Sequence, residues 1–298
     1  MSLPRRWTSR LRTLARSLQE ATPQGRLAGG NPTGALRGRQ AASRVLLASC
    51  FLLFTIVFLS ACAASTQPVV KLGLVAPFEG RYRHIGYEAI YAARLAIREI
   101  NARGGLNGHR IELVALDDRG EPEQAVTAAR QLVLDPQVVA VVGHLRPDST
   151  DAALKIYCEA GLPVIAIESA VQGCESAYVL GSAPRDRWPE DQLIFVSNAP
   201  DPNGLFAAQD FVKNYNVIPI DGTRAGPIAL QTYDVLNLLF EAIDRAAKIN
   251  RGGVQAALRQ IDFTGLGAKY AFDQQGKLID PQTYVFKYDK DQNPQLIP

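Results

Sequence analysis

The residues best able to do chemistry are few: an acidic pair, Asp117-Asp118, three histidines and four cysteines. The histidines (84, 109 and 144) show no zinc-binding spacing such as H-E-x-x-H. The sequence also has no G-x-S-x-G, no P-loop and no G-x-G-x-x-G motif. We therefore expect no enzymatic activity, no metal and no cofactor, and we interpret Asp117-Asp118 as a helix-capping pair.

Cys62 is the cysteine with the clearest chemistry, because it ends a long apolar run. Val45 to Ala64 contains no charged residue and as a helix would span about 30 Å, one hydrocarbon core. Leu59-Ser60-Ala61-Cys62 resembles a bacterial lipobox, in which a peptidase cleaves before the cysteine and its thiol takes a diacylglycerol. We predict a basic tail (1–44), a signal peptide's apolar segment (45–61), lipid attachment at Cys62 and a tether (62–68). An uncleaved transmembrane anchor is the alternative.

The distribution of charge also separates residues 1–44 from the rest of the chain. Residues 1–44 hold nine arginines and one acid, whereas the remainder holds 23 basic and 28 acidic residues. The tail fits the positive-inside rule. Binding of nucleic acid or anionic lipid is an alternative on charge alone, but Trp7 is the tail's only aromatic residue, so we expect no nucleic-acid partner. Over its whole length of 298 residues the chain is 47% apolar and 20% charged, which excludes a disordered or polytopic membrane protein.

The remainder alternates between apolar strand runs and amphipathic helix patterns. The expected strands are 69–76, 110–116, 138–143 and 164–167, and the expected helices are 86–103, 122–134 and 148–159. This order predicts an α/β protein with a Rossmann-like, doubly wound parallel sheet. Cys158 then lies at the bottom of the fourth strand and Cys174 beyond its top, about 13–20 Å away, so we expect two thiols.

Several motifs, in order, resemble one family. These are I-R-E-I-N-A-R-G-G-L-N-G (97–108), V-V-G-H-L (141–145), S-N-A-P-D-P (197–202) and A-F-D-Q-Q-G-K-L (271–278). Together they resemble type I periplasmic substrate-binding proteins, on the branched-chain amino-acid (leucine-binding-like) branch of ABC transporters. In that family two Rossmann-like lobes close on a ligand.

The middle of the chain is too short for the family's second lobe. Only about 25 residues, 168–192, separate the fourth strand from the next one, while each strand–helix unit needs about 30. We therefore expect essentially one lobe (69–262, truncated at about 176–192), with later helices at 205–216, 227–249 and 252–261. A β-hairpin annex (263–298) would pair about 268–272 with 283–288. A shrunken second lobe over 177–298 is the alternative.

The resemblance also implies a site beyond the carboxyl ends of the strands. The family's carboxylate-binding serine position holds Pro147, the next holds Asp148, and its threonine and aromatic positions hold Ala170 and Ile85. A pocket recast for a polar or cationic ligand would use the charged and hydroxyl residues nearby: Arg146, Ser149, Thr150, Glu168 and Ser169. The alternative is that these residues only cap a helix or stand as solvated loop charges.

The lipobox predicts an extracytoplasmic, membrane-anchored lipoprotein, and the family resemblance implies that it binds an amino acid or related small polar solute for an ABC permease. Because one lobe covers little of a ligand, binding would be weak, or the protein degenerate. The alternative is a protein-interaction module that uses the exposed lobe face and binds no small molecule.

Overall fold

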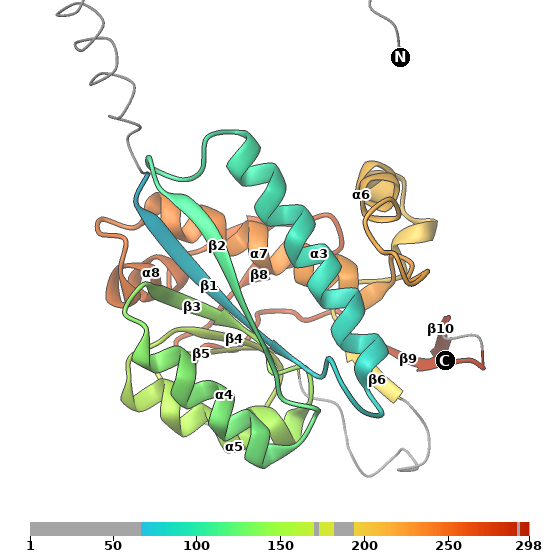
Figure 1. Ribbon diagram of the computed structural model, residues 1–298, viewed down its shortest axis with the longest axis horizontal. Coiled ribbons are helices and arrows are strands. Elements are labelled where there is room, and N and C mark those ends of the chain that lie inside the picture. The colour runs from blue at the N-terminus through green and yellow to red at the C-terminus, as the bar shows by residue number, and fades with distance from the viewer. Residues whose placement is uncertain (1–66, 170–172, 182–193, 291–292, 298) are drawn as a thin grey trace, which may run out of the picture. The chain divides into compact units, whose positions relative to one another are not determined.

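The computed structural model describes residues 67–169, 173–181, 194–290 and 293–297 (Figure 1). The predicted basic tail, apolar segment and Cys62 lie outside these ranges. Within them, no helix combines the length and the apolar character needed to cross a membrane. The predicted domain boundaries remain a prediction.

The centre of the fold is a five-stranded parallel sheet. Its strands are β1 (Val69–Ala76), β2 (Arg110–Asp117), β3 (Val138–Val142), β4 (Val164–Glu168) and β5 (Ala177–Gly181), in the order β2-β1-β3-β4-β5. The first four lie where the apolar runs predict them, so the α/β fold class with a Rossmann-like parallel sheet is confirmed. The fifth was not predicted.

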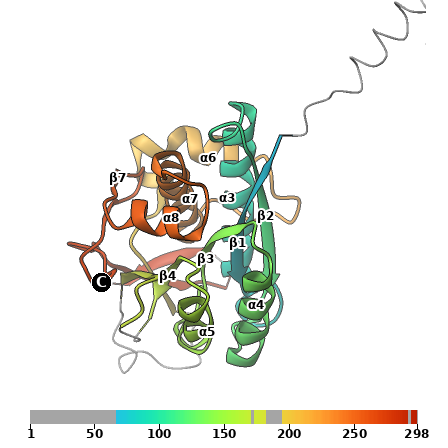
Figure 2. The same cartoon turned by 90° about the vertical axis from the view of Figure 1, so that its left-hand side faces the viewer.

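Helices cover both faces of this sheet (Figure 2). α4 (Pro122–Leu134) and α5 (Pro147–Glu159) pack on one face, and α3 (Arg83–Ala102), α7 (Pro227–Arg245) and α8 (Arg251–Leu258) on the other. Gly73 shows how closely the layers approach, because a Cβ there would lie 2.9 Å from Cδ1 of Leu132 on α4. A larger residue in β1 would push α4 away from the sheet.

Two small antiparallel sheets complete the fold. One has the order β10-β9-β6, from Pro294–Ile297, Tyr284–Tyr288 and Ile194–Ser197; the other pairs β7 (Asp262–Thr264) with β8 (Lys269–Ala271). A short α6 (Gln209–Tyr215) follows two 3₁₀ turns, Pro202–Gly204 and Phe206–Ala208.

The predicted hairpin between 268–272 and 283–288 is therefore wrong in its pairing. β8 pairs with β7, and β9 pairs with β6 and β10. The physical reason lies in the turn between β7 and β8: the buried Asp234 carboxylate accepts hydrogen bonds from Leu266 N and Gly267 N, both at 2.8 Å. This contact folds 262–264 back onto 269–271 before the chain reaches 284.

The arrangement of the later elements favours one lobe over the alternative of a shrunken second lobe, while the domain division itself stays a prediction. β5 joins the main sheet, and α7 and α8 pack on that same sheet. In the described residues there is one parallel sheet, as expected for essentially one lobe.

The expectation of two free thiols is wrong as well, because Cys158 and Cys174 form a disulfide with a Cα–Cα distance of 5.7 Å. β5 is the reason. Since β4 and β5 are parallel, with Val164 opposite Ala177, the chain must return to the start of the sheet before β5 begins. Cys174 therefore lies at that edge, beside the end of α5, and not beyond the top of β4.

Candidate functional site

The carboxyl ends of β1, β2 and β3 meet at one edge of the sheet, where the family resemblance places a ligand. Asp117, the last residue of β2, ties neighbouring loops together there. Its Oδ1 accepts hydrogen bonds from Phe78 N at 2.7 Å and Arg119 N at 2.9 Å. The helix-capping interpretation of Asp117-Asp118 is therefore wrong, because the N-cap of α4 is Glu121, which makes no side-chain cap hydrogen bond, and Asp117 instead holds the loops that follow β1 and β2.

The first turn of α5 carries two of the predicted site residues, Ser149 and Thr150. Both are buried. The Thr150 hydroxyl donates to the backbone carbonyls of Arg146 (2.9 Å) and His144 (3.2 Å). This hydroxyl is therefore already hydrogen-bonded within the protein. Ser149 Oγ has no hydrogen-bond partner within the described part of the chain. The positive end of the α5 dipole and the unpartnered Ser149 hydroxyl suit an anionic or polar ligand group, although the Ser149 side chain is fully buried.

The other three predicted residues lie around this helix start. Ser169 Oγ donates to Oδ1 of Asp151 on α5 at 2.6 Å, so the structure does bring β4's end to the helix. Arg146 precedes the helix, and its guanidinium stacks 4.2 Å from the Tyr82 ring centroid. Glu168 ends β4, and its side chain lies outside the described part of the structure. Their role in binding stays a prediction.

Sequence reasoning missed a buried polar chain beneath this edge. Nδ1 of His144 lies 2.6 Å from Oδ2 of Asp118, and its Nε2 lies 3.1 Å from the Tyr157 hydroxyl. All three are fully buried. Burial raises the pKa of Tyr157, which therefore remains a phenol able to donate to Nε2. The signal was present: Asp118 directly follows β2, and His144 follows β3 after one glycine.

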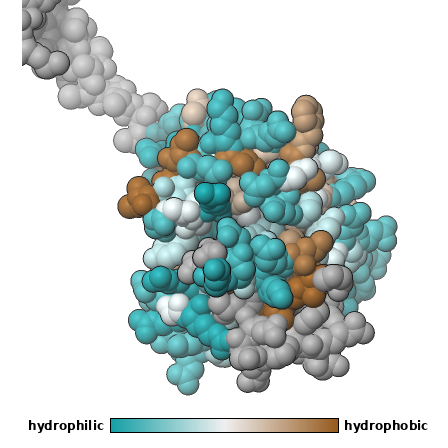
Figure 3. All heavy atoms as spheres, turned by 90° about the vertical axis from the view of Figure 1, so that its right-hand side faces the viewer, coloured by the Kyte–Doolittle hydropathy of each residue, from teal (hydrophilic) through white to brown (hydrophobic). Residues whose placement is uncertain are grey.

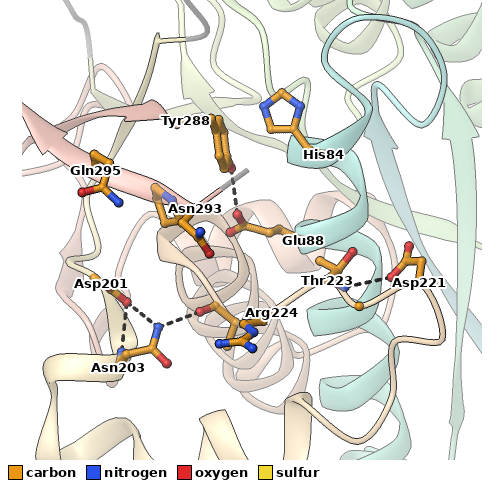
Figure 4. Close-up of a pocket in the computed structure, with 13 residues that line it drawn as sticks. His84, Glu88, Asp201, Asn203, Asp221, Thr223, Arg224, Tyr288, Asn293 and Gln295 are labelled. Atoms are coloured by element: carbon orange, nitrogen blue, oxygen red, sulfur yellow. Dashed lines mark hydrogen bonds between the residues drawn. The ribbon is translucent and has the colours of Figure 1, made fainter. Parts of the chain in front are cut away.

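A cavity lies at a different place, between the start of α3, residues 201–203 and 221–225, and the β9–β10 strands (Figure 4). Its volume is about 600 Å³. Polar side chains dominate its lining, among them His84, Glu88, Asp201, Asp221, Arg224 and Tyr288.

Glu88 is the buried centre of this cavity. Tyr288 donates its hydroxyl to Oε1 at 2.7 Å, and Ala229 N donates to Oε2 at 3.2 Å from the first turn of α7. Burial raises the pKa of Glu88 to about 7, against the lowering effect of the Tyr288 and Ala229 hydrogen bonds; the nearby Asp201 charge also raises it. Burial and Arg83 lower the pKa of His84 to about 4, so its ring is neutral near pH 7.

The part of the chain that forms the parallel sheet is similar to known proteins. Residues 69–188 match the model of a family described as periplasmic binding protein. The "Amino acid binding protein" of Pseudomonas aeruginosa is 42% identical over 96 residues, which are 32% of this chain and 26% of that protein. The "Leu/Ile/Val-binding protein" of Escherichia coli K12 is 30% identical over 195 residues, 59% of this chain and 53% of that protein. The chain thus spans about half, or less, of these curated relatives.

Solved structures show the same fold. The branched-chain amino acid transporter substrate binding protein LivJ from Streptococcus pneumoniae, in complex with isoleucine, matches with a TM-score of 0.61 and 16% identity. The match covers 77% of this chain and 99% of that one. Such identity establishes the architecture and not the ligand. The chain is therefore similar to periplasmic binding proteins, among them Leu/Ile/Val-binding proteins, and its match to the family model covers residues 69–188.

Proposed function

We propose that this chain is an extracytoplasmic, lipid-anchored solute-binding component of an ABC transporter, and not an enzyme. The observation that carries the proposal is the match of residues 69–188 to a binding-protein family, over a parallel sheet with the start of α5 at its carboxyl edge. Its partner would be an ABC permease, and its ligand an amino acid or related small polar molecule.

The same edge argues for weak binding. Pro147 replaces a residue that could offer an N–H and a hydroxyl, and the hydroxyls of Thr150 and Ser169 are already engaged by the protein. Ser149 keeps a free hydroxyl within the described residues. A single sheet edge also covers less of a small ligand than a closed cleft, which buries most of the ligand's surface.

Calorimetry on the full chain in detergent micelles tests the ligand. Leucine, isoleucine, glutamine and glutamate form the panel, and we expect dissociation constants above about 100 μM, that is, weaker than roughly −5.5 kcal/mol. Ser149→Ala should abolish any heat, while Thr127→Ala, on the exposed side of α4, should leave it unchanged. Low-micromolar binding of any of these solutes would show that the site is not degenerate.

The anchoring part of the proposal rests on two cysteine observations. The lipobox motif ends at Cys62, and the Cys158–Cys174 disulfide favours an oxidising compartment outside the cytoplasm. Mass spectrometry of the membrane-extracted protein should find a mature chain that begins at an acylated Cys62. Cys62→Ser should abolish the modification, whereas Cys50→Ser, inside the apolar run, should retain it. A full-length, unmodified chain in the membrane would instead indicate an uncleaved anchor.

A protein-interaction module is the second candidate. Phe206, Val217 and Ile220, which flank α6, expose large apolar side chains. Figure 3 shows that the hydrophobic groups on this side of the molecule are separate and surrounded by hydrophilic surface. A docking face of this kind is usually continuous. Light scattering distinguishes the two: stable self-association of the detergent-extracted chain would favour the module.

A further inference from the structure

We propose that the cavity of Figure 4 is a binding site for a small organic cation, an alkylammonium or guanidinium compound, separate from the sheet-edge site at α5. The site would be formed by Asp201, Asp221 and Glu88 around the neutral ring of His84. It goes beyond the proposed transport function and uses none of the residues on which that function depends.

The first argument is the size and lining of the cavity. About 600 Å³ falls within the range of small-molecule sites. Its polar lining suits a hydrophilic ligand rather than an apolar amino-acid side chain. Its walls come from four separate parts of the chain: α3, the loop before the first 3₁₀ turn, the loop before α7, and β9–β10. These elements converge on one point, as Figure 4 shows.

The second argument is uncompensated negative charge. Asp201, Asp221 and Glu88 line the cavity, and no basic side chain forms an ion pair with any of them in the part of the chain that is described. Burial raises the pKa of Glu88 to about 7, and the nearby charge of Asp201 adds to that increase. With its pKa near 7, Glu88 is only partly ionised at neutral pH, so Asp201 and Asp221 carry most of the negative charge. Desolvation raises the pKa of Asp221, but hydrogen bonds from Thr223 and Tyr91 outweigh it and lower that pKa, so Asp221 remains ionised.

The third argument is independent of these acids and concerns His84. The residue is only 8% exposed, and its Nε2 has no hydrogen-bond partner within the described residues. An unpaired buried nitrogen is costly, since it has lost water and gained nothing. Its ring stands at one end of the cavity, packed edge-on against Tyr288 at 4.0 Å between centroids. A neutral imidazole beside an acidic cavity can accept a hydrogen bond from an ammonium or guanidinium N–H.

The charge and hydrogen-bond pattern selects the ligand class. Carboxylates and an unprotonated imidazole offer acceptors, which a cation with several N–H donors satisfies together. Tyr288 adds an aromatic face next to His84. A small anion would meet Asp201 and Asp221 with like charge, which disfavours it. Besides His84, Arg224 is the one basic side chain among the described residues of the lining, and it is exposed to solvent.

Calorimetric titration of the full chain in detergent with putrescine tests this, with 1,4-butanediol as an uncharged molecule of nearly the same shape. We expect putrescine to bind at least tenfold more tightly than butanediol. Asp201→Asn and Asp221→Asn should each weaken binding about tenfold. Both variants keep a side-chain oxygen to accept the hydrogen bonds that Asn203 N and Thr223 N donate to the native carboxylates.

Two control variants separate this proposal from its alternatives. Asp210→Asn removes an exposed acid of α6 outside the cavity and should leave the affinity unchanged. Ser149→Ala should also leave it unchanged. Equal binding of putrescine and butanediol, absence of binding, or an equal loss in Asp210→Asn would overturn the proposal. Loss confined to Ser149→Ala would place the cation at the α5 site, which overturns this inference while the proposed function stands.

Discussion

At the scale of single residues, Glu88 joins two helices that are far apart in the sequence. Its carboxylate comes from α3 and accepts a hydrogen bond from Ala229 N, 141 residues later, in the first turn of α7. Gly226, the N-cap of α7, leaves room for it: a Cβ there would lie 2.5 Å from Oε2 of Glu88. A side chain from another element thus satisfies α7's N-terminus, because the helix has no side-chain cap of its own.

The raised pKa of Glu88 predicts a pH-dependent stability. The pKa shifts from 4.5 to about 7 on folding, so between these values the folded state holds a proton that the unfolded state has lost. The contribution of Glu88 to the free energy of unfolding should therefore be largest below pH 4.5 and should fall by about 3 kcal/mol as the pH rises through 7.

Urea denaturation of wild type and Glu88→Gln across pH 4 to 8 measures this contribution. The wild-type value minus the variant value should decline over that window, because the amide of the variant binds no proton. Asp234, whose pKa burial raises to about 6, contributes equally to both proteins and cancels in the difference. Parallel stability curves would contradict the assignment.

Individual contacts of this kind were beyond sequence reasoning. Ser149, Thr150 and Ser169 could be placed near the start of α5 because each lies within a few residues of a strand end or of the helix start. The Asp118–His144–Tyr157 chain was missed because its members come from β2's end, the β3–α5 loop and the body of α5. The cavity at Glu88 was missed for the same reason, since its walls come from four distant segments.

At the scale of elements, Arg251 at the start of α8 ties together three others. Its guanidinium donates to the backbone carbonyls of Val133 (3.0 Å) and Asp135 (2.9 Å) at the end of α4 and of Val138 (3.1 Å) in β3. It also reaches Ala160 O, after α5, at 3.5 Å. These carbonyls are the acceptors that helix C-termini and a strand start leave unpaired. A planar fork suits several acceptors at once, and a lysine ammonium does not.

Arg251→Lys should therefore lower the free energy of unfolding by about 2 kcal/mol, since it keeps the charge but loses several charge-assisted hydrogen bonds. Arg245→Lys is the matched control, because Arg245 pairs with Glu241 one helical turn away on an exposed surface. That change should cost less than about 0.5 kcal/mol. Equal effects in chemical denaturation would refute the bracing role of Arg251.

The Cys158–Cys174 disulfide should also contribute to the free energy of unfolding. Cys158 and Cys174, 16 residues apart, link the end of α5 to the connection before β5. Cys158→Ala/Cys174→Ala should lose about 3 kcal/mol of unfolding free energy. Adding dithiothreitol should destabilise wild type by a similar amount and leave the double variant unchanged. Wild-type stability that does not respond to reductant would show that the bond does not form.

The elements themselves were largely predictable. β1 and α4 have the predicted bounds, since Pro77 ends the first apolar run and Pro122 opens a helix. β5 was missed because the β4–β5 connection, residues 169–176, is too short for the crossover helix that the alternating pattern leads one to expect. Because β5 was not predicted, Cys174 was placed at the wrong end of the sheet. The β8 and β9 strands lie close to where they were predicted, but strand patterns do not specify partners.

At the scale of the whole molecule, ligand response should differ from that of a two-lobed binding protein. Such a protein closes by moving one lobe against the other, whereas residues 67–297, where described, contain a single parallel sheet with helices on both faces. Since the described residues contain one parallel sheet, we expect a bound ligand to reorder loops and side chains and not to move one lobe against another.

Small-angle X-ray scattering of the detergent-extracted chain, with contrast matched to the detergent, tests this. A folded unit of about 230 residues has an expected radius of gyration near 17 Å. This radius should change by less than about 0.3 Å when a saturating solute is added. A two-lobed leucine-binding protein treated identically is the control and should contract. Contraction of this chain on binding would mean that it closes like its longer relatives, and weak binding could then not be attributed to the lack of a second lobe.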